Sequence, residues 1–412
     1  MLSYSGSTFC FYSKLLAKFD EISKLVLKNY VSFKIYNSTT DLPNDWDILS
    51  HSNIFLSTAY LKVLEQSAPD NMDCHFIGFF DDTELVGIAI AQFLDLNKLQ
   101  SFGERDRCLK TSVRNFVFRN FSSHVLFVGN NMLTGQNGFS ISEKLDKVEF
   151  LKILKSATET IKIKYRQKGK KIHLVSFKDF YAEEIPEFEQ AGFSNLYRFS
   201  TQPNMVFEID ESWQSEQDYI NALSKKYRDQ YKRSRKRADR IEKRKMHLDD
   251  IIANEKTINE LYFHVAQNAP FNTFFLASNH FQKLKEILKD KFLFYGYFID
   301  GKLIGFNTLI KNGDAMDTYF LGYDESVQKE KMLYLNMLYD MIAYSINKGF
   351  KEIVFARTAL EIKSSVGAKP VTMYGFIEHS NKMIDCNMKR LFGYLEPEVT
   401  WQERNPFKAI DN

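Results

Sequence analysis

A short segment in the last quarter of the sequence combines residue types that bind anions and move protons. It reads RTALEIKSSVGAKP, from Arg357 to Pro370. The guanidinium of Arg357 and the ammonium of Lys363 can each hold a phosphate or a carboxylate. The carboxylate of Glu361 can accept a proton. Thr358 and Glu361 also have the spacing of a helix capping box, so a purely structural role for these two residues stays open.

Three tyrosines upstream of this segment are candidate proton donors. Tyr319 and Tyr323 lie in the run DTYFLGYDE, and Tyr339 follows within a pattern typical of a helix. A phenolic hydroxyl can protonate a leaving group. The chain holds 21 tyrosines, so each assignment depends on position alone. The eight histidines and four cysteines show no metal-ligand spacing, which predicts that no metal takes part.

A strongly basic stretch divides the chain. Residues 225–245 contain twelve Lys or Arg against three acids, and the remainder carries a net charge of −6 because the whole chain is +3. The stretch predicts a helix with a solvated basic face or a surface that meets an anionic partner. For the second interpretation, the candidate nucleic-acid-binding residues are Lys232, Arg233, Arg235 and Lys236.

Bulk composition indicates a packed protein with ample chain for two cores. The chain has 412 residues, of which 44% are hydrophobic. Its longest apolar runs are shorter than the roughly 20 residues of a membrane span, so we expect no transmembrane segment. Four scattered cysteines and no secretory signal favour a cytoplasmic location. Residues 1–32 form an amphipathic extension that could pack on its own domain or lie on a membrane surface.

The elements around the candidate residues can be predicted from local patterns. Asp300-Gly301 between two alternating apolar runs predicts a β-hairpin, and residues 315–322 predict a further strand. Leu335, Leu338, Ile342 and Ile346 recur at helical spacing before Gly349. Ile353–Phe355 predicts one more buried strand.

The first half of the chain repeats this unit. Gly78, Phe80, Asp82, Leu85 and Gly87 match Gly296, Phe298, Asp300, Leu303 and Gly305 without a gap. Two further echoes follow in the same order, which favours an internal duplication over two unrelated hairpins.

The order strand, strand, strand, helix, strand, short helix resembles the back half of the GNAT superfamily of N-acyltransferases. The duplication, the basic helix and the ending ART-x-x-E-x-K-x-x-x-GA-x-P are similar to the Fem-type, peptidoglycan-recognition branch. The predicted fold is α/β with mixed sheets. Its parts are an N-terminal extension (1–32), a first GNAT-like domain (33–210), a basic connecting helix (211–247), a second GNAT-like domain (248–395) and a tail (396–412).

The resemblance implies an acyl donor lying where the fourth and fifth strands separate, here the strands before Gly322 and Arg357. Unpaired strand amides would stabilise the oxyanion formed when an amine attacks the donor carbonyl. The donor would be acyl-CoA or aminoacyl-tRNA. The acceptor would be an amine on a small molecule, a lipid or a cell-wall precursor. On this basis we expect Tyr319, Tyr323 and Glu361 to be catalytic. The expected donor-binding residues are Gly322, Lys329, Lys331, Tyr339, Arg357, Thr358 and Lys363.

One departure bears on the donor. The turn that holds the CoA pyrophosphate in the family is rich in glycine, whereas this chain reads GYDESVQKEKMLY from Gly322. Asp324 and Glu325 add negative charge, which Lys329 and Lys331 could offset. This departure favours a tRNA-borne donor. The alternative function is a nucleic-acid-binding protein that uses the basic helix on an inactive scaffold.

Overall fold

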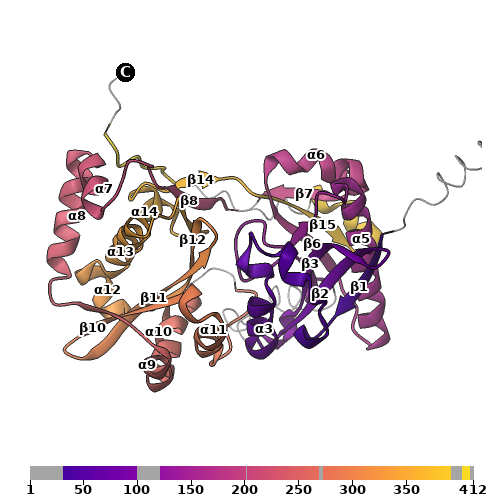
Figure 1. Ribbon diagram of the computed structural model, residues 1–412, viewed down its shortest axis with the longest axis horizontal. Helices are drawn as coiled ribbons and strands as arrows, with labels where there is room; N and C mark the ends of the chain where they lie inside the picture. Colours follow the sequence, from indigo (N-terminus) through magenta and orange to yellow (C-terminus); the bar gives the residue numbers. More distant parts are fainter. Residues whose placement is uncertain (1–30, 100–120, 201, 269–271, 391–400, 409–412) are drawn as a thin grey trace, which may run out of the picture.

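The computed structural model describes residues 31–99, 121–200, 202–268, 272–390 and 401–408. Figure 1 shows two lobes side by side, each built around a β-sheet. Lobe 1 is the part around the sheet that contains β1 to β7, and lobe 2 is the part around the sheet that contains β8 to β14. Within the described ranges, no helix is both long enough and apolar enough to cross a membrane.

Both sheets are organised on a β-hairpin, as the sequence predicts. In lobe 1 the hairpin joins β2 (Met72–Asp81) to β3 (Glu84–Asp95), and in lobe 2 it joins β10 (Phe292–Ile299) to β11 (Lys302–Asn312). Asp300 and Gly301 have φ angles of 48° and 79°, as a two-residue hairpin turn requires. The register shifts after Phe79 in lobe 1 and after Tyr297 in lobe 2, which are equivalent positions. The shared bulge confirms that the two hairpins are copies of one unit.

The order of strands in lobe 1 is β1-β2-β3-β4-β6-β15-β7, and β5 pairs separately with β3. The added strands are β1 (Ser32–Tyr36), β4 (His124–Val128), β5 (Phe139–Ile141), β6 (Leu174–Phe180), β7 (Tyr197–Ser200) and β15 (Tyr374–His379). In lobe 2 the order is β14-β8-β13-β12-β11-β10-β9. Its added strands are β8 (Asn204–Glu208), β9 (Glu242–Lys245), β12 (Ala315–Tyr323), β13 (Glu352–Ala356) and β14 (Lys369–Val371).

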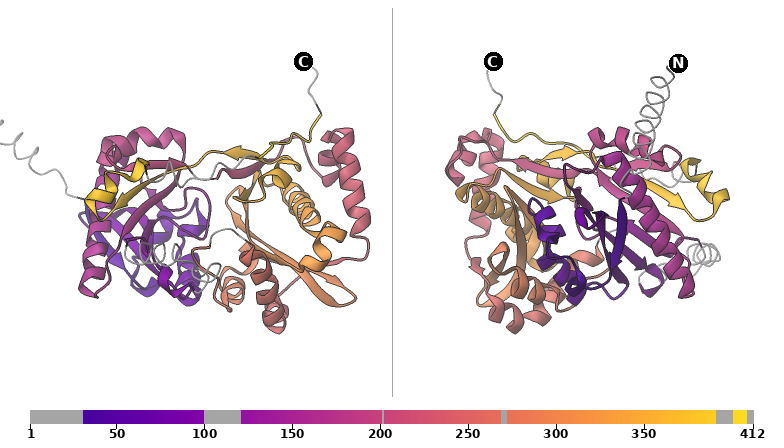
Figure 2. Two further views of the ribbon diagram at one scale, coloured as in Figure 1. Left: turned by 180° about the vertical axis from the view of Figure 1, so that it is seen from behind. Right: turned by 45° about the vertical axis from the view of Figure 1, so that its right-hand side comes forward.

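Two strands pair in the lobe other than the one to which the predicted domain boundaries assign them. β15 comes after all the strands of lobe 2, yet it pairs with β6 and β7 in lobe 1. β8 lies inside the range expected for the first domain, yet it pairs with β13 and β14. The yellow segment that crosses between the lobes in Figure 2 leads to β15. The expected boundaries at residues 210 and 395 therefore do not follow the strand pairing.

Helices cover both faces of each sheet. In lobe 1 they are α2 (Trp46–Leu49), α3 (Thr58–Ser67), α5 (Lys147–Gln167) and α6 (Ile185–Phe188). In lobe 2 they are α7 (Glu216–Ala222), α8 (Lys225–Arg237), α9 (Leu248–Ala253), α10 (Glu255–Gln267), α11 (His280–Leu288), α12 (Glu325–Lys331), α13 (Leu333–Asn347) and α14 (Leu360–Ser364). α15 (Lys382–Asp385) follows β15. One hydrophobic core is shared by α3 of lobe 1 and α10 and α11 of lobe 2. The two lobes are therefore packed together through apolar surface.

The helix patterns in the sequence are mostly confirmed. α13 lies where the periodicity predicts it, and α7 begins with a capping box between Ser215 and Asp218. α3 starts at Thr58, after a short 3₁₀ turn over Ile54–Leu56. The basic helix is interrupted, because Leu223 adopts an extended conformation and pairs with Phe407. Residues 1–30 of the predicted amphipathic extension lie outside the described residues.

Candidate active site

Strands β12 and β13 of lobe 2 separate partway along their length. They run parallel and pair only from Ala315 to Asp317 on β12. Beyond Asp317, no described strand pairs with this edge of β12, although the Thr318 hydroxyl still donates to the carbonyl of Val354 at 3.0 Å. We call this separation the strand split. The equivalent strands of lobe 1, β4 and β6, pair from Val125 to Val128 at the end of β4. The split is therefore a property of lobe 2.

A bulge in β12 lies at the beginning of the strand split. Thr318 pairs with Leu309 and Leu321 pairs with Asn307, so β12 contains one residue more than β11 in this interval. At this bulge the Thr308 hydroxyl donates a hydrogen bond to the carbonyl of Phe320 at 2.6 Å. A bulge disrupts the regular ladder and redirects backbone groups. Together with the split, it offers backbone amides to a carbonyl oxygen lying beside β12.

Asp317 is the last residue of β12 that pairs with β13, and its side chain is only 6% exposed. Burial raises the pKa of Asp317 to about 7, and the neighbouring carboxylate of Glu352 contributes to the increase. The side-chain amide of Asn312 donates to one carboxylate oxygen at 3.1 Å and partly opposes this increase. A carboxyl group with this pKa is suited to accept and return a proton near neutral pH.

The carboxylate of Glu352 lies close enough to Asp317 to raise its pKa, and Glu208 lies on the next strand, β8. Glu352 stands directly opposite Glu208 in the pairing of β13 with β8. Burial, followed by repulsion from Glu208, raises the pKa of Glu352. We call Asp317, Glu352 and Glu208 the acidic group. Its members favour a cationic ligand at the base of the strand split.

Tyr319 lies on β12 two residues after Asp317 and contacts lobe 1. Its hydroxyl is 3.3 Å from that of Tyr60 and 3.1 Å from Nε2 of His280. Nδ1 of His280 is 3.0 Å from the carbonyl of Ser67, which can only accept, so Nδ1 carries the proton. Burial lowers the pKa of His280 to about 4, so the ring is neutral and Nε2 accepts from Tyr319. The single proton of Tyr319 is thereby engaged with His280.

The other two predicted tyrosines lie on the opposite side of the lobe 2 sheet. Tyr323 packs near Tyr334 of α13, with ring centroids 6.3 Å apart. Tyr339 is 1% exposed, and its hydroxyl accepts from the side chain of Gln230 in α8 at 3.2 Å. Burial raises the pKa of Tyr339 to about 12. The structure therefore does not bring Tyr323 and Tyr339 together with Tyr319.

Arg357 joins the two lobes. It follows β13, and its guanidinium forms a salt bridge with Asp179 at the end of β6, the strand of lobe 1 that is equivalent to β13. Asp179 is 2% exposed and also pairs with the ammonium of Lys178 at 2.5 Å. This contact gives Arg357 a structural partner instead of the free guanidinium that donor binding would use.

The segment after β13 is held in a strained conformation. Ala356, Thr358 and Ala359 all have positive φ angles, which side chains with a Cβ rarely adopt. The buried ammonium of Lys363 donates to the carbonyls of Phe355, Ala356 and Arg357 at 2.6 to 3.1 Å, and burial lowers its pKa to about 7. Lys363 thus fixes the segment that forms one side of the strand split.

Thr358 and Glu361 do not form the capping box that their spacing predicts. Ala359 is the N-cap of α14 and makes no side-chain cap, and Thr358 is exposed. The exposed carboxylate of Glu361 accepts from the guanidinium of Arg404 at 3.1 Å, and this pairing lowers its pKa. Its hydrogen bonds among the described residues are with the 401–408 segment, and none is with β12.

The residues expected to compensate for the missing glycine turn are dispersed. A Cβ at Gly322 would lie 2.6 Å from the backbone of α10, so this glycine lets α10 pack against β12. The next segment forms α12, with Asp324 as its N-cap. Lys329 is exposed at the surface, and Lys331 pairs with Glu330 at 3.1 Å. The place of the expected pyrophosphate turn is therefore taken by a short helix that begins with two acids.

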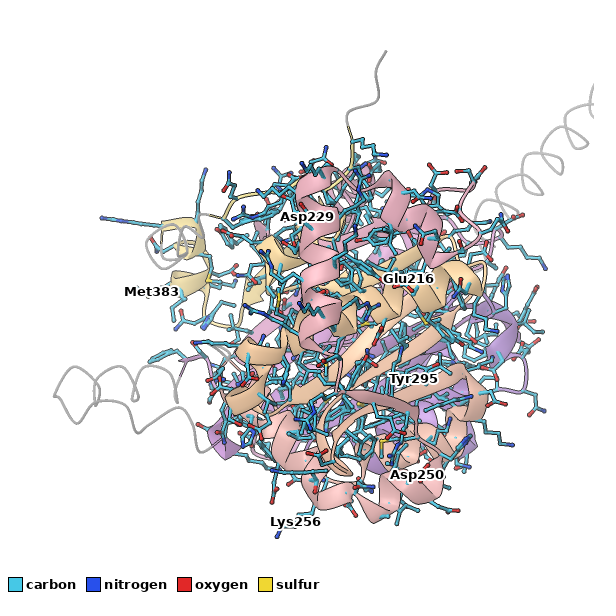
Figure 3. The ribbon with its side chains drawn as sticks, turned by 90° about the vertical axis from the view of Figure 1, so that its left-hand side faces the viewer. Glu216, Asp229, Asp250, Lys256, Tyr295 and Met383 are labelled. Carbon is cyan, nitrogen blue, oxygen red and sulfur yellow. The ribbon has the colours of Figure 1, made fainter. Side chains whose placement is uncertain are left out.

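The basic helix α8 lies on the outer face of lobe 2 (Figure 3). Lys232, Arg233 and Lys236 are exposed, so they are available to an anionic partner. Arg235 differs, because it pairs with Glu216 at 2.8 Å and with Asp340 at 2.7 Å. Arg235 therefore anchors α8 to α7 and α13. Because both carboxylates occupy its guanidinium, Arg235 is not available to bind a nucleic acid.

Three residues of the site were missed by sequence reasoning: Asp317, His280 and Tyr60. Asp317 is an acid within a predicted buried strand, which is the signal that could have identified it. No comparable signal exists for His280 and Tyr60, because they reach Tyr319 only after the lobes pack together. Within the described residues, no group of three or more His, Cys, Asp or Glu side chains is arranged to hold a metal ion.

Comparison with known proteins gives structural matches only. No family model and no curated sequence matches the chain. Among solved structures, FemX is 11% identical, covers 89% of this chain and 100% of its own, and has a TM-score of 0.52. A tandem GNAT protein from the clavulanic acid biosynthesis pathway is 9% identical, covers 85% and 99%, and has a TM-score of 0.46. L-PGS from Bacillus licheniformis is 11% identical, covers 82% and 96%, and has a TM-score of 0.43.

The duplicated hairpin-led sheets, the split between β12 and β13 and the match over the full length of FemX define the class. The protein has a fold of duplicated GNAT-like domains, similar to that of FemX.

Proposed function

We propose that the protein is an N-acyltransferase that moves an activated acyl or aminoacyl group to an amine. The ester or thioester bond of the donor breaks, and an amide bond forms between its carbonyl carbon and the amine nitrogen. The amine loses a proton to a base, and the leaving oxygen or sulfur takes one up. The donor carbonyl lies in the strand split, where backbone amides of β12 stabilise the oxyanion.

The observation that carries this proposal is the position of Asp317. Its carboxyl group stands where β12 and β13 part, and its pKa is raised to about 7. It therefore takes the proton from the attacking amine and returns it to the leaving group. Tyr319 shares this side of β12, but its proton is engaged by His280. Tyr319 therefore forms a wall of the site, and contacts from both lobes hold it in place.

The acidic group supports an amine as the acceptor. Most amines are cationic at neutral pH, and Asp317, Glu352 and Glu208 attract such a group to the base of the strand split. The acceptor is then deprotonated beside the carbonyl that it attacks. The acceptor classes that we propose are an amino group on a small molecule, on a lipid or on a cell-wall precursor.

Two features favour aminoacyl-tRNA over acyl-CoA as the donor. First, α12 occupies the place of the expected pyrophosphate turn and starts with Asp324, whose carboxylate accepts from the amide and hydroxyl of Ser326. A second carboxylate, Glu325, also stands there. Second, the exposed cations Lys232, Arg233 and Lys236 of α8 offer a surface to a phosphodiester backbone. Use of a donor made in the cytosol agrees with a cytoplasmic location.

A transfer assay with radiolabelled donors tests the proposal. Mixed aminoacyl-tRNA and a set of acyl-CoAs are each incubated with the full chain and three amines: free lysine, phosphatidylethanolamine and a lysine-containing muramyl peptide. We expect a labelled amide from aminoacyl-tRNA, reduced about 10²- to 10⁴-fold by Asp317→Asn. Transfer from acyl-CoA alone would contradict the donor assignment. Amide formation from neither donor would contradict the enzyme assignment.

The alternative is a nucleic-acid-binding protein on an inactive scaffold, and the exposed face of α8 is the observation in its favour. Under this alternative, alanines at Lys232, Arg233 and Lys236 abolish RNA binding, while Asp317→Asn changes nothing measurable. Loss of amide formation in Asp317→Asn with tRNA binding intact separates the enzyme from this alternative.

A further inference from the structure

A hollow lined by lysines lies in lobe 2, away from the strand split. It has a volume of about 660 Å³, and its polar lining consists of Lys245, Asp290, Tyr295, Lys311, Tyr344 and Lys348. β10 begins, β11 ends and α13 ends at this place, which is the sheet edge where β12 and β13 start. The split lies toward the other ends of these two strands. We call the site the lysine hollow.

The charges in the lysine hollow are unbalanced. Three ammonium groups, those of Lys245, Lys311 and Lys348, share one carboxylate, Asp290. Within the described part of the chain, none of the three lysines has a carboxylate within 4.0 Å. Lys351, only three residues after Lys348, shows the contrast, because it pairs with Asp314 at 2.6 Å. Like charges brought together in this way are destabilising unless an anion joins them.

A fourth lysine confirms that the local field is positive. Lys285 is 8% exposed and donates to the carbonyls of Lys289 and Phe292 at 3.3 and 3.1 Å. Burial lowers the pKa of Lys285, the nearby ammonium groups of Lys245 and Lys311 lower it further, and the carboxylate of Asp290 partly opposes them. The cations of the hollow are therefore close enough to repel a neighbouring charge.

Two tyrosines complete the walls. The rings of Tyr295 and Tyr344 meet edge to face, with centroids 6.0 Å apart. Burial raises the pKa of Tyr295 to about 12, so its hydroxyl keeps its proton and can donate to an anion. Figure 3 shows Tyr295 on the same side of the molecule as α8. The lining thus combines ammonium and hydroxyl donors in one concave place.

We propose that the lysine hollow binds the phosphate group of a small molecule about the size of a mononucleotide. Phosphate is a dianion near neutral pH and matches several ammonium donors. Ligand pockets span about 300 to 1,000 Å³, and the hollow falls in this range, whereas a membrane surface would need a projecting face. The site is separate from the strand split, so this inference does not depend on the proposed transferase activity.

Calorimetric titration of the full chain tests the site with three probes: AMP, inorganic phosphate and uncharged adenosine. We expect saturable binding of AMP and phosphate that weakens as salt rises, and no binding of adenosine. The double variant Lys245→Glu/Lys348→Glu changes two exposed side chains and weakens AMP binding about tenfold or more. The control Lys256→Glu/Lys302→Glu makes the same change of net charge at exposed lysines of lobe 2 and leaves AMP binding unaltered.

Three results would each overturn the proposed site. The first is an equal weakening of AMP binding in both double variants. The others are adenosine binding that is as tight as AMP binding, and a failure of AMP and phosphate binding to saturate. If the charge-reversed protein fails to fold, Lys245→Gln/Lys348→Gln replaces it, with a smaller loss expected. Sedimentation with phosphatidylglycerol vesicles covers the lipid source. Vesicle binding that depends on these lysines, without AMP binding, would overturn the small-molecule assignment.

Discussion

Tyr60 of lobe 1 and Tyr319 of lobe 2 share a hydrogen bond, with their oxygen atoms 3.3 Å apart. Asn130 donates to Tyr60 at 3.3 Å, and Tyr319 donates to His280, so the bonds run in one direction across the lobe junction. The first lobe therefore fixes the strand that borders the split in the second. This relationship gives lobe 1 a role in shaping the candidate site of lobe 2.

Asp317→Asn should lower transfer about 10²- to 10⁴-fold and stabilise the protein at alkaline pH. The folded-state pKa of Asp317 is raised to about 7, so the native state favours the protonated acid, and stability falls as pH rises from about 4 to 7. Asparagine removes this loss, of the order of a few kcal/mol, and can still accept from Asn312. Unfolding midpoints at pH 5 and pH 8 measure the effect.

Two observations check the role of Asp317. In the wild type, kcat/KM should rise with pH through a limb near 7. Asp314→Asn is the control, because this exposed carboxylate has only a surface ion pair with Lys351. An unchanged pH limb in Asp317→Asn would show that another group is the base.

His280→Ala should destabilise the protein by about 2 to 3 kcal/mol, because it removes the acceptor of the Tyr319 hydroxyl proton and the ring donor to the carbonyl of Ser67 at the lobe junction. The pKa of His280 is lowered to about 4, so wild-type stability should fall as pH drops from 6.5 toward 4, and the variant should lack this contribution. Urea unfolding at pH 7 and pH 5 measures both effects. The exposed His264→Ala is the control, and equal losses in the two variants would refute the role of His280.

Asp179→Asn should cost more stability than Arg357→Ala. Loss of Asp179 leaves the buried side chains of Lys178 and Arg357 together without their shared carboxylate, at about 3 to 5 kcal/mol. Loss of Arg357 leaves Asp179 paired with Lys178 and should cost about 1 to 2 kcal/mol. Thermal unfolding of the two variants ranks them. The opposite order would contradict the sharing of Asp179 by Lys178 and Arg357.

Replacing Lys232, Arg233 and Lys236 with alanine should weaken tRNA binding and lower its salt slope by about 2 to 3. These side chains are exposed on α8, so folding should be unaffected. Fluorescence anisotropy with labelled tRNA at several salt concentrations gives the slope. The control replaces exposed Lys152, Lys164 and Arg166 of α5 in lobe 1. Equal effects of the two triple variants would contradict a specific tRNA surface.

Local patterns predicted the hairpins, α13 and the succession of elements along the second half of the chain, because each depends on neighbouring residues. The turn at Asp300 and the apolar stripe of α13 need no partner from elsewhere in the chain. The exchange of β8 and β15 could not be predicted in this way, because each pairs with strands far away in sequence.

The chemistry of the site was predicted less well for the same reason. In the sequence, Arg357 and Lys363 both look available to bind an anion. In the folded protein Arg357 pairs with Asp179 of the other lobe, and Lys363 donates to three backbone carbonyls. The raised pKa of Asp317 depends on burial at the junction, which no local pattern reports. The sequence shows which residues carry a charge, whereas the partner of each charged side chain is known only from the folded structure.

Photocrosslinking tests most directly whether the strand split receives the donor. A tRNA carrying a photoreactive aminoacyl group is irradiated with the full chain, and the modified peptides are identified by mass spectrometry. The account predicts modification within residues 318–323 of β12 or the 356–359 segment after β13, suppressed by excess unlabelled aminoacyl-tRNA. Labelling confined to α8, or spread evenly over the surface, would contradict it.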